Sequence, residues 1–118
     1  RDLIVTGVQT CALPIWTDIT RMLTLNGSQW SKGKEMHLCP MQFDIADRVI
    51  EQMSNPNEIV FDPFGGLMTV PYRAILKGRF GMGVELNPRY FIDGASYCRA
   101  AEQNVNMPTL FDFEKISV

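Results

Sequence analysis

The chain has 118 residues, which is enough for at most one ordinary domain. A hydrophobic content of 46% and a charged content of 20% are typical of a globular protein and exclude a disordered one. The net charge of −2 provides no basic surface for a nucleic acid, so most phosphate-binding charge would have to lie on residues outside this chain. No apolar run is long enough to span a bilayer, and no membrane partner is expected.

The three cysteines are odd in number and widely spaced: Cys11, Cys39 and Cys98. This fits a reducing compartment and predicts no metal site.

Residues 1–15 are expected to lie outside the fold. The stretch from Val5 to Ile15 resembles the conceptual translation of a sequencing-library adapter. A secretory signal is rejected, because Asp2 follows Arg1 directly and no sustained apolar core is present. On this interpretation the native coding sequence before about Trp16 is missing, and the chain is a fragment.

Residues 16–33 predict a loop with a short helix. The helix is expected over residues 18–25, and Asn26-Gly27-Ser28 has the composition of a turn. Residues 31–35 are polar and are expected to form a loop.

A longer helix is predicted after Pro40, which favours an extended conformation for the residue before it. Asp44 is expected at the N-cap with Asp47 in a capping-box position, and the helix should end near Ser54. The apolar residues at helical spacing, expected on its core face, are Ile45, Val49, Ile50 and Met53.

The next segment predicts a strand, a helix, a strand and a helix. The first strand is the apolar run starting at Ile59; Pro71 suits the first turn of the following helix, and Gly78 suits its end. The second strand is expected over 80–85 and the second helix over 88–103, with a short apolar tail over 105–118. The residues expected on the core face of this last helix are Phe91, Ala95 and Cys98. This order predicts the α/β fold class.

Asp62-Pro63-Phe64-Gly65-Gly66 joins the first strand to its helix. An acidic residue and glycines at a strand end are how α/β proteins build nucleotide pockets, although glycines there can also serve turn geometry alone. Glu85 favours the pocket, because a carboxylate at the end of the second strand is where such units bind ribose hydroxyls. The alternative for Glu85 is a solvated carboxylate.

The turn does not have the glycine pattern of a dinucleotide site. Pro63 lacks an N–H group and Asp62 adds negative charge, which suits a ligand with positive charge better than a pyrophosphate. S-adenosylmethionine carries a sulfonium, an ammonium and a ribose, and it is the predicted cofactor.

The stretch VFDPFGGLMTVPYRAILKGRFGMGVELNPRYF, preceded by KEMHLCPMQFDIADRVIEQ, resembles the carboxyl-terminal part of DNA amino-methyltransferases of the N4-cytosine/N6-adenine type with permuted motif order. The resemblance covers residues 34 to about 102, and the cofactor-binding part of the domain is assigned to residues 34–104. It implies a fragment of a Rossmann-like S-adenosylmethionine-dependent methyltransferase, with a partial parallel sheet flanked by helices. It also implies a role in DNA methylation, as in restriction-modification systems, with DNA as the partner. The protein would be cytoplasmic and encoded by a bacterium or a phage, and a homodimer is possible.

The resemblance also implies residue roles. The first cofactor motif would lie around the methionine part and the adenosine, with Thr69 just beyond it, and comprises Asp62, Pro63, Phe64, Gly65 and Gly66. Glu85 would hold the ribose, with Leu86 and Asn87 on the adenine side. The residues expected to fold over the methionine moiety are His37, Pro40 and Gln42.

The catalytic tetrapeptide of this family, which contains Pro-Pro followed by an aromatic, does not occur here. Asn87-Pro88-Arg89-Tyr90 differs from it at the second proline and follows the ribose strand, so it is not assigned a catalytic role. No catalytic residue is therefore predicted, and the chain alone is expected to be inactive. A methyltransferase acting on RNA or a small molecule and a non-catalytic cofactor-fold scaffold both stay open, whereas a nicotinamide-binding unit is the least expected class.

Overall fold

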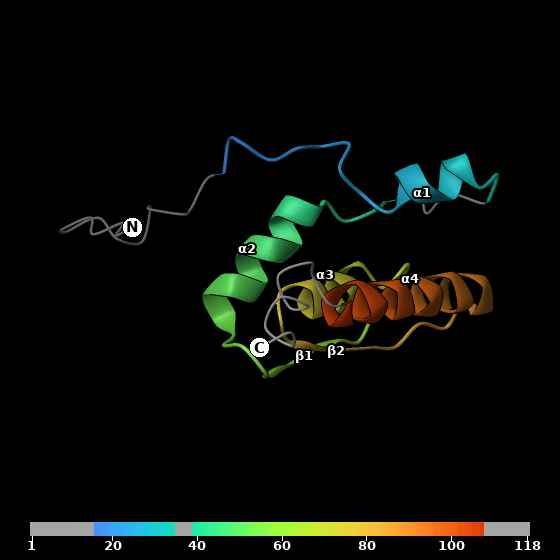
Figure 1. Ribbon diagram of the computed structural model, residues 1–118. Helices are drawn as coiled ribbons and strands as arrows, with labels where there is room; N and C mark the ends of the chain where they lie inside the picture. The colour runs from blue at the N-terminus through green and yellow to red at the C-terminus, as the bar shows by residue number, and fades with distance from the viewer. Residues whose placement is uncertain (1–15, 35–38, 108–118) are drawn as a thin grey trace, which may run out of the picture.

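The computed structural model describes residues 16–34 and 39–107. The elements run in the order α1 (Asn26–Ser31), α2 (Phe43–Met53), β1 (Ile59–Asp62), α3 (Thr69–Leu76), β2 (Phe80–Gly83) and α4 (Pro88–Asn106) (Figure 1). None of the helices in these two ranges is long and apolar enough to cross a membrane. The predicted alternation of strands and helices is confirmed, and the described part of the chain is a mixed α/β structure.

The two strands form a parallel pair in which Ile59 lies opposite Phe80 and Asp62 lies opposite Gly83. Helix α3 connects them and packs against both strands, α2 and α4, so it is the central element of the fold (Figure 1). Because parallel strands end at a common edge, the segments that follow β1 and β2 are brought together there.

Glycines in β2 allow α3 to approach the sheet closely. A Cβ atom on Gly81 would lie 2.4 Å from the backbone oxygen of Pro71, and one on Gly83 would lie 2.6 Å from the Met68 sulfur. The alternation Phe-Gly-Met-Gly thus places the two glycines on the helix side of β2 and the two large side chains on the other side.

Met68 occupies the space between the turn, β2 and α4. Its backbone has a left-handed φ of 62°, an unfavourable conformation for a residue with a Cβ. Its side chain is only 4% exposed and fills the volume that Cβ atoms would take at Gly65, Gly83 and Gly94. This close packing offsets the backbone cost and fixes the start of α3.

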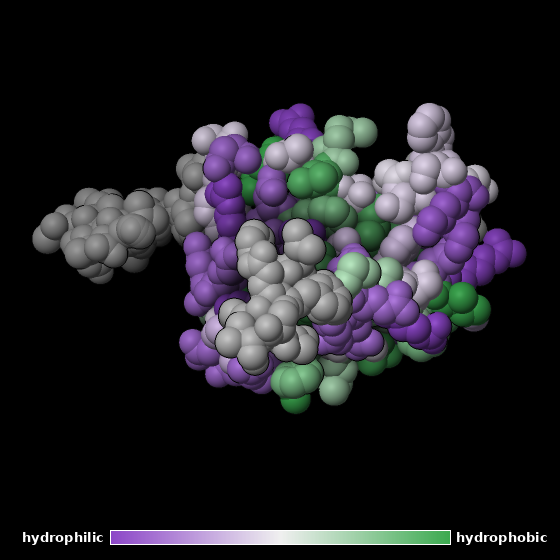
Figure 2. Space-filling view, viewed as in Figure 1, coloured by the Kyte–Doolittle hydropathy of each residue, from purple (hydrophilic) through white to green (hydrophobic). Residues whose placement is uncertain are grey.

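The sheet face opposite α3 is uncovered in the described structure. Its five apolar side chains are between 48% and 64% exposed: Ile59, Phe61, Phe80, Met82 and Val84. Figure 2 shows hydrophobic side chains at the lower edge of the molecule, where Figure 1 places the strands. A buried parallel sheet needs cover on both faces, and within residues 16–34 and 39–107 only one face has it.

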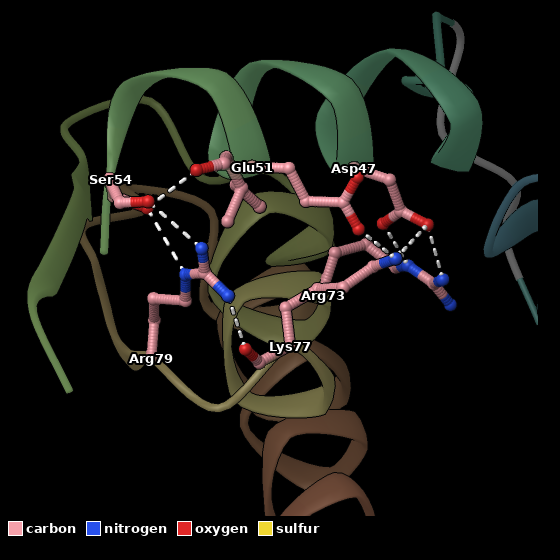
Figure 3. A network of polar contacts seen from close by, with 7 residues as sticks. Asp47, Glu51, Ser54, Arg73, Lys77 and Arg79 are labelled. Carbon is pink, nitrogen blue, oxygen red and sulfur yellow. Dashed lines mark hydrogen bonds and ion pairs between the residues drawn. The ribbon is translucent and has the colours of Figure 1, made fainter. Parts of the chain in front are cut away.

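Helix α2 is joined to α3 by a bidentate ion pair (Figure 3). Arg73 Nε donates to Asp47 Oδ1 at 2.7 Å, and Arg73 Nη2 donates to Asp47 Oδ2 at 2.6 Å. Both side chains are less than a fifth exposed. The guanidinium also lies 4.8 Å from the ring centroid of Phe43, the first residue of α2. This contact fixes the first half of α2 on α3.

The second half of α2 is held by more exposed contacts (Figure 3). Lys77 Nζ lies 2.6 Å from a Glu51 carboxylate oxygen, and Arg79 Nη2 donates to the carbonyl oxygen of Ser54 at 2.8 Å. Between the two ends, Ala46 and Ile50 pack against Ala74 in a small apolar cluster.

The helix predicted over residues 18–25 is wrong. This segment consists of irregular chain and short turns, and the helix begins instead at Asn26, inside the predicted turn. Asp18 accepts a hydrogen bond from Arg48 at 2.6 Å, and the Thr20 amide donates to Asp44 at 2.7 Å. The Asp18 carboxylate and the Thr20 amide are therefore bonded to α2, and they cannot form the first-turn contacts of a helix over residues 18–25.

The predicted cap of α2 is also wrong. The helix begins two residues earlier than expected, with Gln42 at the N-cap, and neither Asp44 nor Asp47 caps it. Asp47 is used by Arg73 on α3, a contact that helical periodicity does not reveal. On the predicted core face, Ile50 is buried, but Val49 and Met53 are 46% and 79% exposed.

In α4 the predicted core face is displaced. Gly94, Tyr97 and Ala101 are the buried positions, whereas Phe91 is 48% exposed and the side chains of Ala95 and Cys98 are half-buried. The contact of Met68 with Gly94 sets this face, because only a glycine lets the helix come so close. The helix extends to Asn106, and β2 ends at Gly83, two residues before the predicted end.

Replacing Gly81 with Ala should destabilise the fold strongly, because the new methyl group would meet the backbone of Pro71 rather than a side chain that can move. Overpacking of this kind costs about 1–3 kcal/mol. Chemical denaturation followed by circular dichroism measures the loss. Gly27→Ala is the matched control: nothing lies within 4 Å of its Cβ position, and stability should stay equal or rise slightly.

Replacing Asp47 with Asn should reduce both stability at neutral pH and its sensitivity to acid. Burial would raise the pKa of Asp47, but Arg73 and Lys77 outweigh it and hold the pKa below the ordinary 3.8. A lowered pKa contributes stability that is present above about pH 4 and is lost as the pH falls through the folded-state value.

Urea unfolding at pH 7 and at pH 3 tests this expectation. Asp47→Asn should cost about 1.5–3 kcal/mol at pH 7, where a charged hydrogen bond is lost, and less at pH 3. Asp18→Asn removes an exposed partner of Arg48 and serves as control, with a small effect at either pH. An equal loss for Asp47→Asn at both pH values would contradict the assignment.

Candidate functional site

The candidate site lies at the carboxyl edge of the sheet, where the turn after β1 meets the loop before α2. A cavity of about 110 Å³ opens there. Its lining residues come from these two segments and the start of α3: Cys39, Pro40, Met41, Asp62, Phe64, Gly65, Gly66, Leu67, Thr69 and Val70. Typical ligand pockets measure about 300–1,000 Å³, so this cavity fits only part of a nucleoside-sized ligand.

Three consecutive backbone amides of the turn donate their hydrogen bonds within the protein. The Phe64 amide donates to Asp62 Oδ1 at 2.9 Å, and the Gly65 amide to the Val84 carbonyl at 2.8 Å. The Gly66 amide donates to Glu85 Oε2 at 2.8 Å. A phosphate-binding turn needs such amides directed at the ligand, so this turn is unsuited to a pyrophosphate.

The glycines have two different roles. Gly66 has a φ of 56°, a conformation that favours glycine and turns its amide toward Glu85. At Gly65 the space left by the missing Cβ is filled by Met68, whose sulfur would lie 2.5 Å from it. Gly65 thus serves packing rather than the approach of a ligand.

Glu85 joins the ends of the two strands. One carboxylate oxygen accepts from Gly66, and the other accepts from the Asn87 amide at 2.7 Å. A carboxylate has about four acceptor positions, and these two amides use two of those of Glu85. Asn87 caps α4, because its side chain accepts from the Arg89 amide at 3.0 Å.

The site is acidic and rich in hydrogen-bond acceptors. Asp62 lines the cavity and Glu85 lies next to its glycine wall, whereas no Lys or Arg is found among its lining residues within the described ranges. Such a site attracts a ligand with positive charge and hydroxyl donors, and it repels a polyanion.

The structure brings six of the predicted site residues to the cavity: Pro40, Asp62, Phe64, Gly65, Gly66 and Thr69. Glu85 lies next to them through Gly66. Phe64 and Leu86 are 88% and 93% exposed. Gln42, Pro63, Leu86 and Asn87 do not line the cavity. His37 lies outside the described residues.

Sequence reasoning missed Met41, Leu67 and Val70 as lining residues, and it missed Met68 behind the turn. Their apolar character gave no signal beyond ordinary core packing. Of the two cysteines in the described ranges, Cys39 is exposed at the cavity. Burial, with a smaller contribution from Glu102, raises the pKa of Cys98 to about 11, so Cys98 is a thiol at neutral pH. The described residues contain no cluster of His, Cys, Asp and Glu side chains that could hold a metal.

The described structure thus has an acidic pocket at the carboxyl edge of a parallel strand pair, with a strand-end carboxylate bonded to a glycine turn. The sequence profile of a DNA methylase family, N6_N4_Mtase, matches residues 14–95. The chain therefore belongs to this DNA methylase family.

Two curated relatives are similar to this chain. DNA adenine methyltransferase YhdJ of Escherichia coli (strain K12) is 41% identical over 61 residues, which cover 47% of this chain and 21% of that protein. The type II methyltransferase M1.MboII of Moraxella bovis is 37% identical over 57 residues, which cover 48% of this chain and 22% of that protein. The matched part thus spans about a fifth of the length of each relative. No solved structure matches the chain.

Proposed function

We propose that this chain forms the S-adenosylmethionine-binding part of a DNA methyltransferase with a Rossmann-like fold. The observation that carries the proposal is the bond between Glu85 and the Gly66 amide, which holds a carboxylate beside the cavity of the turn. The whole enzyme would methylate an exocyclic amine of adenine at N6 or of cytosine at N4.

The residues present fit this cofactor in charge and in hydrogen bonding. When bound, S-adenosylmethionine supplies an electrophilic methyl group on a sulfonium. Glu85 would accept hydrogen bonds from its ribose, while Asp62 would stabilise positive charge near the turn. The small cavity would enclose only part of the cofactor, with Phe64, Leu86 and Asn87 contacting the rest at the open side.

The proposed substrate rests on the DNA methylase family and on the name of one relative, a DNA adenine methyltransferase of Escherichia coli (strain K12). With a net charge of −2 and an acidic site, this chain contributes little to phosphate binding. DNA contacts, the base specificity and a homodimer would therefore depend on residues beyond those described here. A cytoplasmic, bacterial or phage-encoded enzyme belongs to the same proposal.

Calorimetry with S-adenosylhomocysteine tests the site. Replacing Glu85 with Gln removes the charge and keeps the size, and it should weaken binding about 10- to 100-fold, the range for hydrogen bonds to a charged acceptor. NAD should not bind to the unmodified chain, because the amides of Phe64, Gly65 and Gly66 donate within the protein and the acidic edge repels a pyrophosphate.

Glu102→Gln is the matched control, because Glu102 lies on α4 beside a different groove. Its affinity should equal that of the unmodified chain, and melting curves should show that both variants are folded. Equal affinities for Glu85→Gln and Glu102→Gln would overturn the proposed role of Glu85.

A non-catalytic scaffold is the second candidate, and the absence of a Pro-Pro-aromatic tetrapeptide from the sequence favours it for this chain taken alone. We expect the 118-residue chain to bind S-adenosylhomocysteine but to transfer no radioactive methyl group from S-adenosylmethionine to DNA. A catalytically active homologue serves as the positive control in the same assay. Measurable turnover by this chain would show that a catalytic group had been missed.

A further inference from the structure

The cavity has two walls, one formed by the segment before α2 and the other by the turn and the start of α3. Pro40 and Met41 lie just before α2, whereas Gly66 lies in the turn before α3 and Thr69 is the first residue of α3. The distance between the walls therefore depends on how the first turns of α2 sit on α3. Between these two helices the described chain passes through β1 and the turn, so the connection itself does not fix the first turns of α2.

Apolar contacts alone determine this position weakly. The cluster between the two helices consists of Ala46 and Ile50 on α2 and Ala74 on α3, with Val60 and Val70 packed beside it. The centroid of the Phe43 ring also lies 5.8 Å from that of the Tyr72 ring of α3. Contacts of this kind are non-directional, so they hold the helices together without fixing one relative position. A directional contact is needed to set one position.

We infer that the ion pair between Asp47 and Arg73 is a positioning device that holds the Cys39–Met41 wall of the cavity over its α3 wall. Two parallel hydrogen bonds of 2.6 and 2.7 Å fix both the distance and the orientation of the two helices. The same guanidinium packs on Phe43, which begins α2 directly after the wall segment. This inference rests on the proposed cofactor site.

Arg73 lies one turn after Thr69, so the pair stands next to the cavity without lining it. Lysine cannot replace arginine in this role, because it has neither the fork of donors nor the planar group that stacks on Phe43. The pair of Lys77 and Glu51 joins the same two helices one turn further from the cavity. Lys77 Nζ also lies 3.5 Å from Asp47 Oδ2. Glu51 is half exposed, and Glu51→Gln leaves Asp47 and Arg73 in place, so this variant provides an internal control.

A nitroxide on Cys39 reports the position of the wall without any ligand. The labelled chain carries Cys11→Ser and Cys98→Ala, so that the label has a single attachment site. Arg73→Lys and Asp47→Asn should each increase the mobility of the nitroxide, whereas Glu51→Gln should leave its spectrum unchanged. The double variant Asp47→Arg with Arg73→Asp should partly restore the spectrum, which a loss of stability alone would not do.

Affinity for S-adenosylhomocysteine is the second measurement. Arg73→Lys and Asp47→Asn should each weaken binding by about tenfold, a typical size for residues that act through a neighbouring element. Ile50→Val lowers the melting temperature through the core and should leave both spectrum and affinity unchanged. All measurements are made well below the lowest melting temperature.

An unchanged nitroxide spectrum in Arg73→Lys and Asp47→Asn would overturn the inference and leave the pair a purely stabilising role. If the unmodified chain did not bind S-adenosylhomocysteine, the proposed function would fail, but the spectra would still decide whether the pair positions the wall. If the spectra changed while the affinity did not, a positioning role toward the cofactor would be excluded.

Discussion

The structure depends on the hydrogen bonds that join the end of β1 to the end of β2. The amides of Gly65 and Gly66 donate to the Val84 carbonyl and to the Glu85 carboxylate. These bonds continue the sheet beyond its last residue pair and place an acidic group beside the turn. As a result, these two amides are not available to a ligand, and the two carboxylates, Asp62 and Glu85, make this edge rich in acceptors.

Close approach of α3 to the sheet is the second constraint, and it explains an unusual backbone. Met68 adopts a left-handed conformation, and its side chain is enclosed by Gly65, Gly83 and Gly94. Strain of this kind persists when the surrounding structure compensates for it, and it is found most often near functional sites. Here it fixes the start of α3, and with it one wall of the cavity. The opposite sheet face, with Phe61 and Met82, receives no such cover in the described residues.

Sequence reasoning located the strands, α3 and the acidic edge because each has a local signal. Asp62, Gly66 and Glu85 could be found from turn chemistry and spacing, since parallel strands end at the same edge. Sequence reasoning failed where the role of a side chain depends on a partner far along the chain. Asp47 was predicted to cap its own helix but binds Arg73, and Asp44 binds the Thr20 amide. Local rules contain no information on such partners.

The sequence by itself determined the α/β order, the acidic residues of the edge and the resemblance to DNA amino-methyltransferases, because strand and turn preferences act over a few residues. Only the tertiary structure decided which turn amides are occupied, which face of α4 is buried and how α2 is held on α3. The physical reason is that these features depend on close contacts between segments distant in the chain. In such contacts the presence or absence of one Cβ, as at Gly94, determines how two elements meet.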